Sequence, residues 1–258
     1  MKSNLEKKKS LLFVILSGIV ITNALLGEMI GSKIFSLEKT LNVAPAQISL
    51  FGDWVLNFDL SAGVMIWPVV FLTTDIINEY FGKEGVKKIS LLAVAMIIYM
   101  FFMLWIVAKL IPADFWLGLH APLDINLAFE KIFLQSMGII VGSVLAFLLG
   151  QLIDVVVFQK LRKITGNKKI WLRATGSTLV SQLIDSFVVL FVAFYFLGQP
   201  RWTLEQLFSV GTINYSYKFL TAIAATPLIY LAHFLIDMYL GKENAQQMIK
   251  EASESKIR

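Results

Sequence analysis

A four-residue phrase that combines an amide with a carboxylate occurs twice in this sequence, each time inside a long apolar run. The copies are Gln151-Leu152-Ile153-Asp154 and Gln182-Leu183-Ile184-Asp185. Because Gln and Asp stand three residues apart, they share one face of a helix. A carboxylate at bilayer depth costs roughly 2.5 to 3.5 kcal/mol, so each one needs a charged partner or a ligand. The sequence therefore predicts two membrane helices whose polar groups could bind a solute, joined by a basic turn that contains Lys160, Arg162, Lys163, Lys168, Lys169 and Arg173.

Further polar residues with this potential lie in other apolar runs. Asp75, Asn78 and Glu79 stand at positions i, i+3 and i+4, so they share a helical face near the end of their run. Two alternatives need no solute: the carboxylates of Asp75 and Glu79 could pair with Lys83 or Lys87, and the amides could form hydrogen bonds between helices. The candidate substrate-binding residues are Asp185, Gln182, Lys218, Asp154, Gln151, Asp75, Asn78, Glu79, Asn23 and Tyr215.

Asp185 is the most deeply placed of these candidates. It lies twelve residues beyond Arg173, roughly 18 Å along a helix, which is close to the midplane of a hydrocarbon core about 30 Å thick. We therefore predict that Asp185 is the principal ligand carboxylate, with Gln182 and Lys218 beside it. In the alternative, Asp185 and Lys218 form an ion pair that only fixes packing. Lys218 also lies about five residues inside its predicted span and could extend its ammonium group to the membrane surface.

The composition is that of an integral membrane protein. Of 258 residues, 57% are hydrophobic and only 16% are charged, and the mean hydropathy is +0.72. Cysteine is absent and there are only two histidines, which excludes disulfides and thiolate metal sites and argues against a histidine metal site. We expect no cofactor, no metal and no catalytic residue. The net charge of +5 comes from clusters at the ends of apolar runs, so we expect no nucleic-acid partner.

The apolar runs predict an all-α, polytopic fold with six transmembrane helices in a single transmembrane domain, residues 1–258. One run carries a stripe of small residues at every fourth position, Gly138, Gly142, Ala146 and Gly150, which would let another backbone approach closely. Between the first two spans, Pro45 and Gly52-Asp53 punctuate a stretch whose alternation in residues 54–60 suits a short hairpin or interfacial flap. A polar tail follows the last span. The predicted spans are about 11–30, 61–81, 89–110, 132–158, 175–197 and 213–240.

The distribution of basic residues predicts the orientation of these spans. The side that bears both termini carries 17 Lys and Arg residues, and the opposite side carries five. Short loops on the cytoplasmic side of a membrane are enriched in basic residues. We therefore predict that the N- and C-termini are cytoplasmic.

Several strings also resemble a known family, the bacterial inner-membrane queuosine-precursor transporters, which are similar to vitamin uptake transporters. The resemblance covers the second, fourth, fifth and sixth spans, and the first and third by hydropathy alone. It implies a six-helix carrier in the inner (plasma) membrane that imports 7-cyano-7-deazaguanine or its 7-aminomethyl relative for tRNA modification. The strings are Phe71-Leu72-Thr73-Thr74-Asp75 with Phe81-Gly82, Gly150-Gln151-Leu152-Ile153-Asp154 with Val157-Phe158 and Leu161-Arg162, Ser177-Thr178-Leu179 with Asp185 and Phe187, and Tyr215 with Lys218.

The candidate side chains are compatible with a deazapurine as the small-molecule partner, beside the lipid bilayer. A deazaguanine presents adjacent N–H donors that suit a carboxylate, an oxygen that suits an amide or lysine, and a flat ring that suits Tyr or Phe. The resemblance leaves two transport mechanisms open: a stand-alone secondary carrier, and a substrate-capture subunit for a separate ATP-driven module. The sequence contains no phosphate-binding loop. An intramembrane enzyme is a remote alternative, because His-Glu-x-x-His and cysteine are absent. The oligomeric state stays open.

Overall fold

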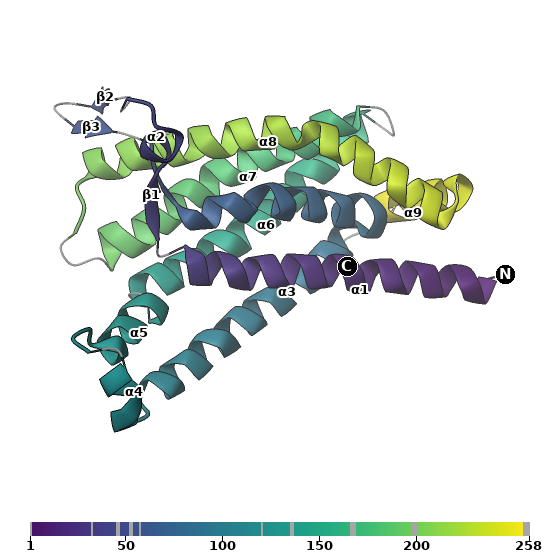
Figure 1. Cartoon of the computed structure of the whole chain (residues 1–258). Helices are drawn as coiled ribbons and strands as arrows, with labels where there is room; N and C mark the ends of the chain where they lie inside the picture. Colours follow the sequence, from purple (N-terminus) through teal and green to yellow (C-terminus); the bar gives the residue numbers. More distant parts are fainter. Residues whose placement is uncertain are drawn as a thin grey trace.

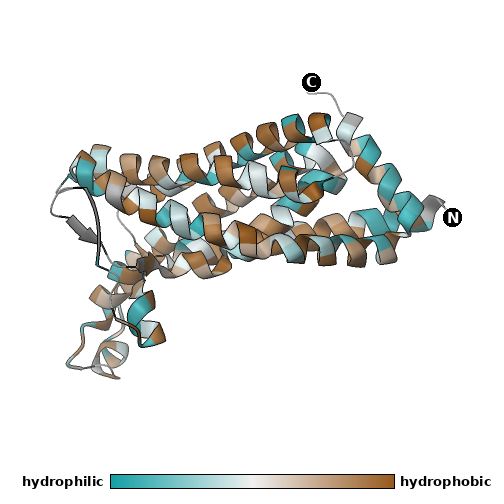
Figure 2. Ribbon diagram, turned by 90° about the horizontal axis from the view of Figure 1, so that it is seen from above, coloured by the Kyte–Doolittle hydropathy of each residue, from teal (hydrophilic) through white to brown (hydrophobic). Residues whose placement is uncertain are grey.

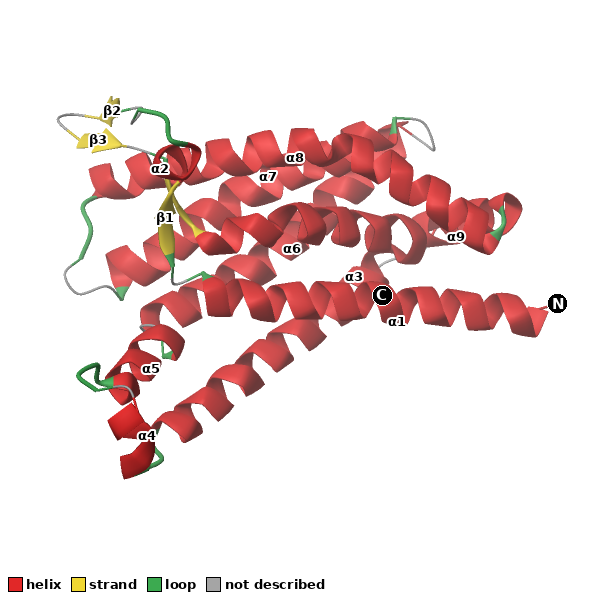
Figure 3. Cartoon of the chain, viewed as in Figure 1, coloured by secondary structure: helices red, strands yellow, loops and turns green. Residues whose placement is uncertain are grey.

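The computed structural model is an elongated bundle of long helices that lie side by side (Figure 1). It describes residues 2–31, 33–44, 47–51, 54–56, 58–119, 121–134, 137–165, 169–197 and 201–254. The strands are short and lie at one end of the bundle, which we call the strand end (Figure 3). The N-terminus and the last helix lie at the opposite end, which we call the α9 end. The long helices are α1 (Lys2–Ile30), α3 (Trp67–Ala108), α6 (Met137–Thr165), α7 (Ile170–Leu190) and α8 (Leu204–Leu240).

Each of these long helices contains a segment that is long and apolar enough to cross a membrane. The segments are Asn4–Ile30, Ala62–Ala108, Ile139–Thr165, Ile170–Phe196 and Leu204–Leu240. Hydrophobic residues cover most of their length, and hydrophilic residues are concentrated toward the α9 end (Figure 2). The chain is therefore an all-α, multi-pass membrane protein apart from its short strands.

Two of the predicted spans, 61–81 and 89–110, correspond to the two halves of α3, which begins at Trp67 and ends at Ala108. The backbone of α3 leaves helical geometry at Gly82, where φ is 65° and ψ is −171°. Glycine adopts a positive φ without the steric cost that a side chain imposes, so the chain can turn sharply here. Beyond Gly82 the second half of α3 runs back toward the strand end at an angle to the first half (Figure 1). Gly82 thus divides α3 into two helical halves, which is consistent with the prediction of two spans in this part of the chain.

Helices α6 and α7 form the antiparallel hairpin that the repeated phrase predicted. A Cβ atom added at Gly142 would lie 3.0 Å from the carbonyl oxygen of Val189, closer than most real Cβ contacts. One added at Gly150 would lie 3.5 Å from the Cβ of Asp185, an ordinary contact. The predicted close approach of another backbone is thus confirmed at Gly142, and its neighbour is α7. After α7 the helix continues as a π-helical turn, η2 (Phe191–Phe196).

The segment between α1 and α3 forms two small antiparallel strand pairs. β1 (Ile34–Ser36) pairs with β4 (Asp59–Ser61), and β2 (Ile48–Phe51) pairs with β3 (Trp54–Leu56), which confirms the predicted hairpin. The short helix α2 (Leu37–Leu41) supplies the buried Glu38, whose carboxylate accepts a hydrogen bond from the Phe58 amide at 2.7 Å. The 3₁₀ turn η1 (Ala62–Ile66) leads into α3. Gly52 and Asp53 lie outside the described residues.

Several helix ends differ from the predicted spans because polar residues extend the helices past the apolar runs. α8 begins at Leu204 instead of 213, behind a capping box formed by Thr203 and Gln206. α6 begins at Met137 instead of 132, because α5 (Ile125–Phe133) occupies the preceding segment, after α4 (Asp114–Leu119).

The predicted polar tail is partly wrong. It contains helix α9 (Lys242–Glu254), which buries Ala245 and Met248 in a core shared with α1, α3 and α8. The small number of apolar residues in this helix hid its buried face from a hydropathy argument, because an amphipathic helix needs only one apolar stripe.

Candidate functional site

A buried ion pair joins α7 and α8 at the deepest predicted site residue. The ammonium group of Lys218 donates a hydrogen bond to Oδ2 of Asp185. Asp185 lies fifteen residues beyond Ile170, about 22 Å along α7. Lys218 lies fourteen residues inside α8 and is only 5% exposed, so it does not extend to a helix end as one alternative suggested. The ion pair that the sequence analysis left as an alternative is therefore present.

The ring of Trp67 contacts the lysine of this ion pair. The Lys218 ammonium lies 3.5 Å from the centroid of the Trp67 ring, at the start of α3. A cation within about 6 Å of an indole centroid is attracted by the electrons of its face. The edge of Trp67 also contacts Phe71, with ring centroids 5.5 Å apart. One lysine thus joins three helices, α3, α7 and α8.

Polar groups without a partner surround the ion pair. The side-chain oxygen of Gln182, one turn before Asp185, has no hydrogen-bond partner among the described residues, and neither does the Ser186 hydroxyl. A buried amide oxygen without a partner forfeits about 1 to 3 kcal/mol, so such atoms mark places where a ligand or water can bind. Glu28 of α1 lies near enough to Asp185 for their charges to interact, and it accepts a hydrogen bond from Ser143.

A second pair of carboxylates lies closer to the α9 end. Asp154 accepts a hydrogen bond of 3.4 Å from the Ser181 hydroxyl, and its charge interacts with that of Asp75. Oδ1 of Asp75 and the side-chain oxygen of Gln151 are buried and have no partner among the described residues. Like the oxygen of Gln182, these oxygens are acceptors without a described partner. They suit the N–H donors of a solute.

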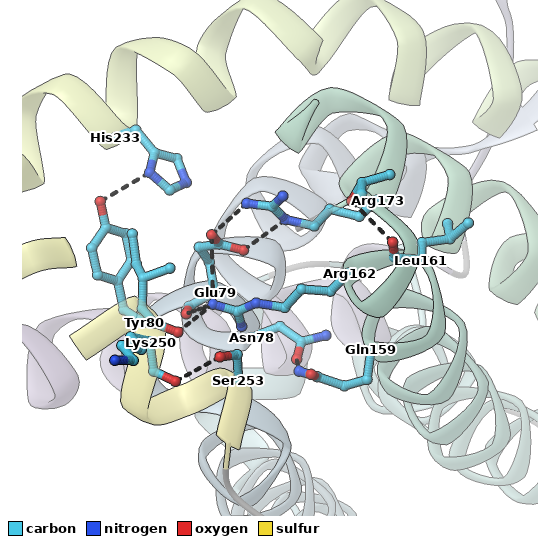
Figure 4. A network of polar contacts seen from close by, with 12 residues as sticks. Asn78, Glu79, Tyr80, Gln159, Leu161, Arg162, Arg173, His233, Lys250 and Ser253 are labelled. Atoms are coloured by element: carbon cyan, nitrogen blue, oxygen red, sulfur yellow. Dashed lines mark hydrogen bonds and ion pairs between the residues drawn. The ribbon is translucent and has the colours of Figure 1, made fainter. Parts of the chain in front are cut away.

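A third cluster surrounds Glu79 and ties three helices together (Figure 4). Arg173 of α7 donates from Nε to one carboxylate oxygen at 2.9 Å and from Nη2 to the other at 2.5 Å. Nη2 of Arg162, on α6, lies 3.7 Å from the same carboxylate. Glu79 is 1% exposed, so its one negative charge is shared by two buried guanidinium groups inside the protein. The bidentate fork of an arginine is the strongest form of carboxylate pairing.

The cluster also reaches the C-terminal helix. Nη2 of Arg162 donates to the backbone oxygen of Ile249 in α9 at 2.5 Å and to that of Glu79 at 3.3 Å. The neighbouring Asn78 accepts a hydrogen bond of 2.8 Å from Gln159 of α6. The suggested partners of Glu79, Lys83 and Lys87, were wrong: within the described part of the chain the two arginines bind it.

A tyrosine extends this polar region to α8. The Tyr80 hydroxyl lies 2.9 Å from Nδ1 of His233 (Figure 4). It donates to Oδ1 of Asp237 at 3.1 Å. A phenol has a single proton. If Tyr80 gives that proton to Asp237, His233 must donate its own Nδ1 proton to the phenol oxygen. The first half of α3 is thereby bonded to α6, α7 and α8 within one turn of helix, and Arg162 of α6 connects this region to α9.

Comparison with known proteins decides the family. The family model described as "Putative vitamin uptake transporter" matches residues 61–232, two thirds of the chain. The chain belongs to this family. A "Probable queuosine precursor transporter" of Bacillus subtilis (strain 168) is 31% identical over 183 residues, which are 69% of this chain and 75% of the relative. The "Queuosine precursor transporter" of Escherichia coli (strain K12) is 27% identical over 169 residues, 66% of this chain and 70% of the relative.

A third relative, a "Probable queuosine precursor transporter" of Haemophilus influenzae (strain ATCC 51907 / DSM 11121 / KW20 / Rd), is 28% identical over 169 residues, 65% of each chain. No solved structure matches the chain. The resemblance that the sequence strings indicated is thus confirmed. The part that matches the vitamin uptake transporter family runs from the start of η1 into α8 and contains every candidate residue except Asn23. α1, the strand pairs β1–β4 and β2–β3 except Ser61, and α9 lie outside it.

The structure brings most, but not all, of the candidates into the interior. Asp75, Asn78, Glu79, Asp154, Gln182, Asp185 and Lys218 are buried, and Gln151 is half-buried. Asn23 bonds the Ile19 carbonyl of its own helix at 2.8 Å, and Tyr215 packs against Phe219. No described contact joins these last two residues to the carboxylates.

The sequence analysis missed four residues that interact with the candidate residues in the structure. They are Trp67, Glu28, Arg162 and Arg173. Arg162 and Arg173 were assigned to a solvated basic turn, yet they are 4% and 2% exposed. A signal existed, since they are the two arginines of an otherwise lysine-rich stretch and arginine is the preferred cation for buried ion pairs. Trp67 carried no such signal, because its contact with Lys218 joins distant parts of the sequence.

Proposed function

We propose that this chain is an inner-membrane carrier that imports a queuosine precursor, 7-cyano-7-deazaguanine or its 7-aminomethyl relative, and that it catalyses no reaction. The names of the relatives supply the substrate class. The observation that carries the proposal is the buried Asp185–Lys218 pair with the unpartnered oxygen of Gln182 beside it. Charges and an empty acceptor at this depth are costly, and transport proteins retain such groups where a solute passes.

In this proposal Asp185 is the principal ligand carboxylate. The adjacent N–H groups of a deazaguanine edge match the two oxygens of a carboxylate, and the oxygen of Gln182 accepts a further donor. Asp75, Asp154 and Gln151 line the next part of the path toward the α9 end. Glu79 and Asn78 fix the helices around that path, since both are bonded to neighbouring helices.

The path requires six crossings with both termini in the cytoplasm. The segment Ala62–Ala108 contains 47 residues, which at 1.5 Å per residue is about 70 Å and more than twice the hydrocarbon thickness. Each half of α3, divided at Gly82, therefore serves as one crossing. The α9 end then faces the cytoplasm, which agrees with the excess of basic residues on the side that bears the termini.

Two measurements test this function. A bacterial strain that cannot make queuosine precursors and lacks its own importer should regain queuosine in its tRNA at low external precursor when it expresses this chain. Unchanged tRNA despite expression in the membrane would remove deazaguanines as substrates. Purified chain in sealed vesicles should then accumulate the precursor without ATP or a partner protein. Binding without accumulation would indicate the capture subunit of an ATP-driven system.

A further inference from the structure

We infer that Trp67 is the surface on which the ring of the ligand stacks, and that the Lys218 ammonium occupies this place until the ligand arrives. The inference rests on the proposed function, because it assumes a flat heteroaromatic ligand. Neither a role for Trp67 nor a displacement of Lys218 follows from the family match, and the sequence offered only Tyr and Phe as ring partners.

The position of one atom supports the first half of the inference. Nζ of Lys218 lies 3.5 Å above the Trp67 ring centroid, where the face of a stacked ring would lie. Ring and ammonium compete for this face, because both are attracted to the electron-rich surface of an indole. Trp67 is also held in place: Phe71 packs against its edge, and Pro68 restricts the backbone that follows. A fixed ring loses little freedom when a ligand stacks on it.

The partner of the same ammonium supports the second half. Lys218 bonds Asp185 while it covers Trp67, so one cation occupies both groups that a deazaguanine would use. A ligand therefore cannot place its N–H edge on Asp185 and its ring on Trp67 unless the ammonium leaves the indole face. The ammonium need not leave the carboxylate altogether, because Asp185 has a second oxygen, beside Gly150. The charge of Asp185 thus stays balanced while the ring of the ligand enters.

Because binding requires both an N–H edge for Asp185 and a flat ring for Trp67, the site should select ligands that have both features. A two-ring heterocycle with adjacent N–H donors satisfies Asp185 and Trp67 together. An aliphatic cation of similar size would only repeat the contacts that Lys218 already makes. The ligand class is therefore a flat, hydrogen-bond-donating heterocycle, and simple amines are excluded.

The test uses the purified full-length chain in detergent with 7-cyano-7-deazaguanine as the probe. Stacking of a base on an aromatic side chain contributes an amount that corresponds to roughly 5- to 150-fold in affinity. Trp67→Leu should weaken binding within that range, and Trp67→Phe by less than about fivefold. Trp105→Leu is the matched control, because Trp105 is half exposed in the other half of α3, and it should bind normally.

A second readout follows Trp67 directly. Ligand that replaces the ammonium should change tryptophan emission, and Trp67→Phe should abolish this change while binding persists. If Trp67→Leu fails to fold, the emission of Trp67→Phe still tests whether the ligand stacks on Trp67. Lys218→Arg should weaken binding without lowering the melting temperature, because a guanidinium stacks on an indole more strongly and holds a carboxylate with two hydrogen bonds.

The outcomes separate the inference from the proposed function. If the unmodified chain binds the probe and Trp67→Leu binds it equally well, Trp67 is not the stacking surface and only this inference fails. Emission changes that survive Trp67→Phe, or normal binding by Lys218→Arg, would overturn it in the same way. An unmodified chain that does not bind the probe at all removes the substrate, and the inference falls with it.

Discussion

Neutralising Glu79 should destabilise the protein more than any other single loss of charge. In Glu79→Gln, two guanidinium groups, Arg162 and Arg173, remain buried at 4% and 2% exposure without a counter-charge. Removal of one member of a buried ion pair costs about 3 to 5 kcal/mol. Since two cations are stranded, we expect the upper end of this range. At about 2 to 4 °C per kcal/mol for a chain of this size, the melting temperature should fall by about 10 to 20 °C.

The assay is thermal unfolding of the purified chain in detergent, with Glu84→Gln as the matched control. Glu84 lies in the same helix but is exposed, so its substitution should change the free energy of unfolding by no more than about 0.5 kcal/mol. Glu79→Gln combined with Arg173→Met should cost less than the sum of the single changes, because each removes the partner of the other. A Glu79→Gln variant that melts with the unmodified chain would refute the buried network.

Three further predictions address topology, packing and binding. Reporter fusions in the three loops predicted to lie outside should all be external, and one cytoplasmic reporter would contradict the six crossings; the sites are Asp53, Ala121 and Arg201. Gly142→Leu should cost about 1 to 3 kcal/mol in a melting experiment, because its side chain meets the backbone of α7, and an unchanged melting point would refute that contact. Asp185→Asn should weaken precursor binding by roughly 1.5 to 3 kcal/mol in the folded fraction, and normal affinity there would refute its role as ligand carboxylate.

Hydropathy was enough to predict the helices, because in a membrane every backbone group must be bonded within its own segment. It could not predict where they end. α8 starts nine residues before its predicted span, since a capping box and not the apolar run sets its first turn. It also missed the packing of α9 against α1, α3 and α8. That packing depends on a narrow buried stripe, which a hydropathy window averages away.

For the site, the expected depth of a residue in the membrane predicted its burial better than the periodicity of polar residues along a helix did. The distance of Asp185 from the basic turn predicted a buried carboxylate, and the structure buries it against Lys218. The contacts of Trp67 and Arg173 could not be predicted, because periodicity reports which residues share a helix face and says nothing about the facing helix. Counting Arg together with Lys as topology signals also concealed the burial of Arg162 and Arg173, whereas Lys160, Lys163 and Lys169 of the same basic turn are exposed.

The two charged networks differ in a way that suggests a division of labour. At Glu79 the carboxylate has both oxygens occupied by a bidentate arginine, and the surplus cation is bonded to backbone oxygens of α3 and α9, so no acceptor remains for a solute. At Asp185 a single lysine pairs with the carboxylate. The unpartnered oxygen of Gln182 lies one turn away on the same helix. A site that must bind and release a solute needs a partner that can move, whereas helices that must stay together need one that cannot. On this physical ground we propose that the solute binds at Asp185 and that Glu79 anchors the helices around it.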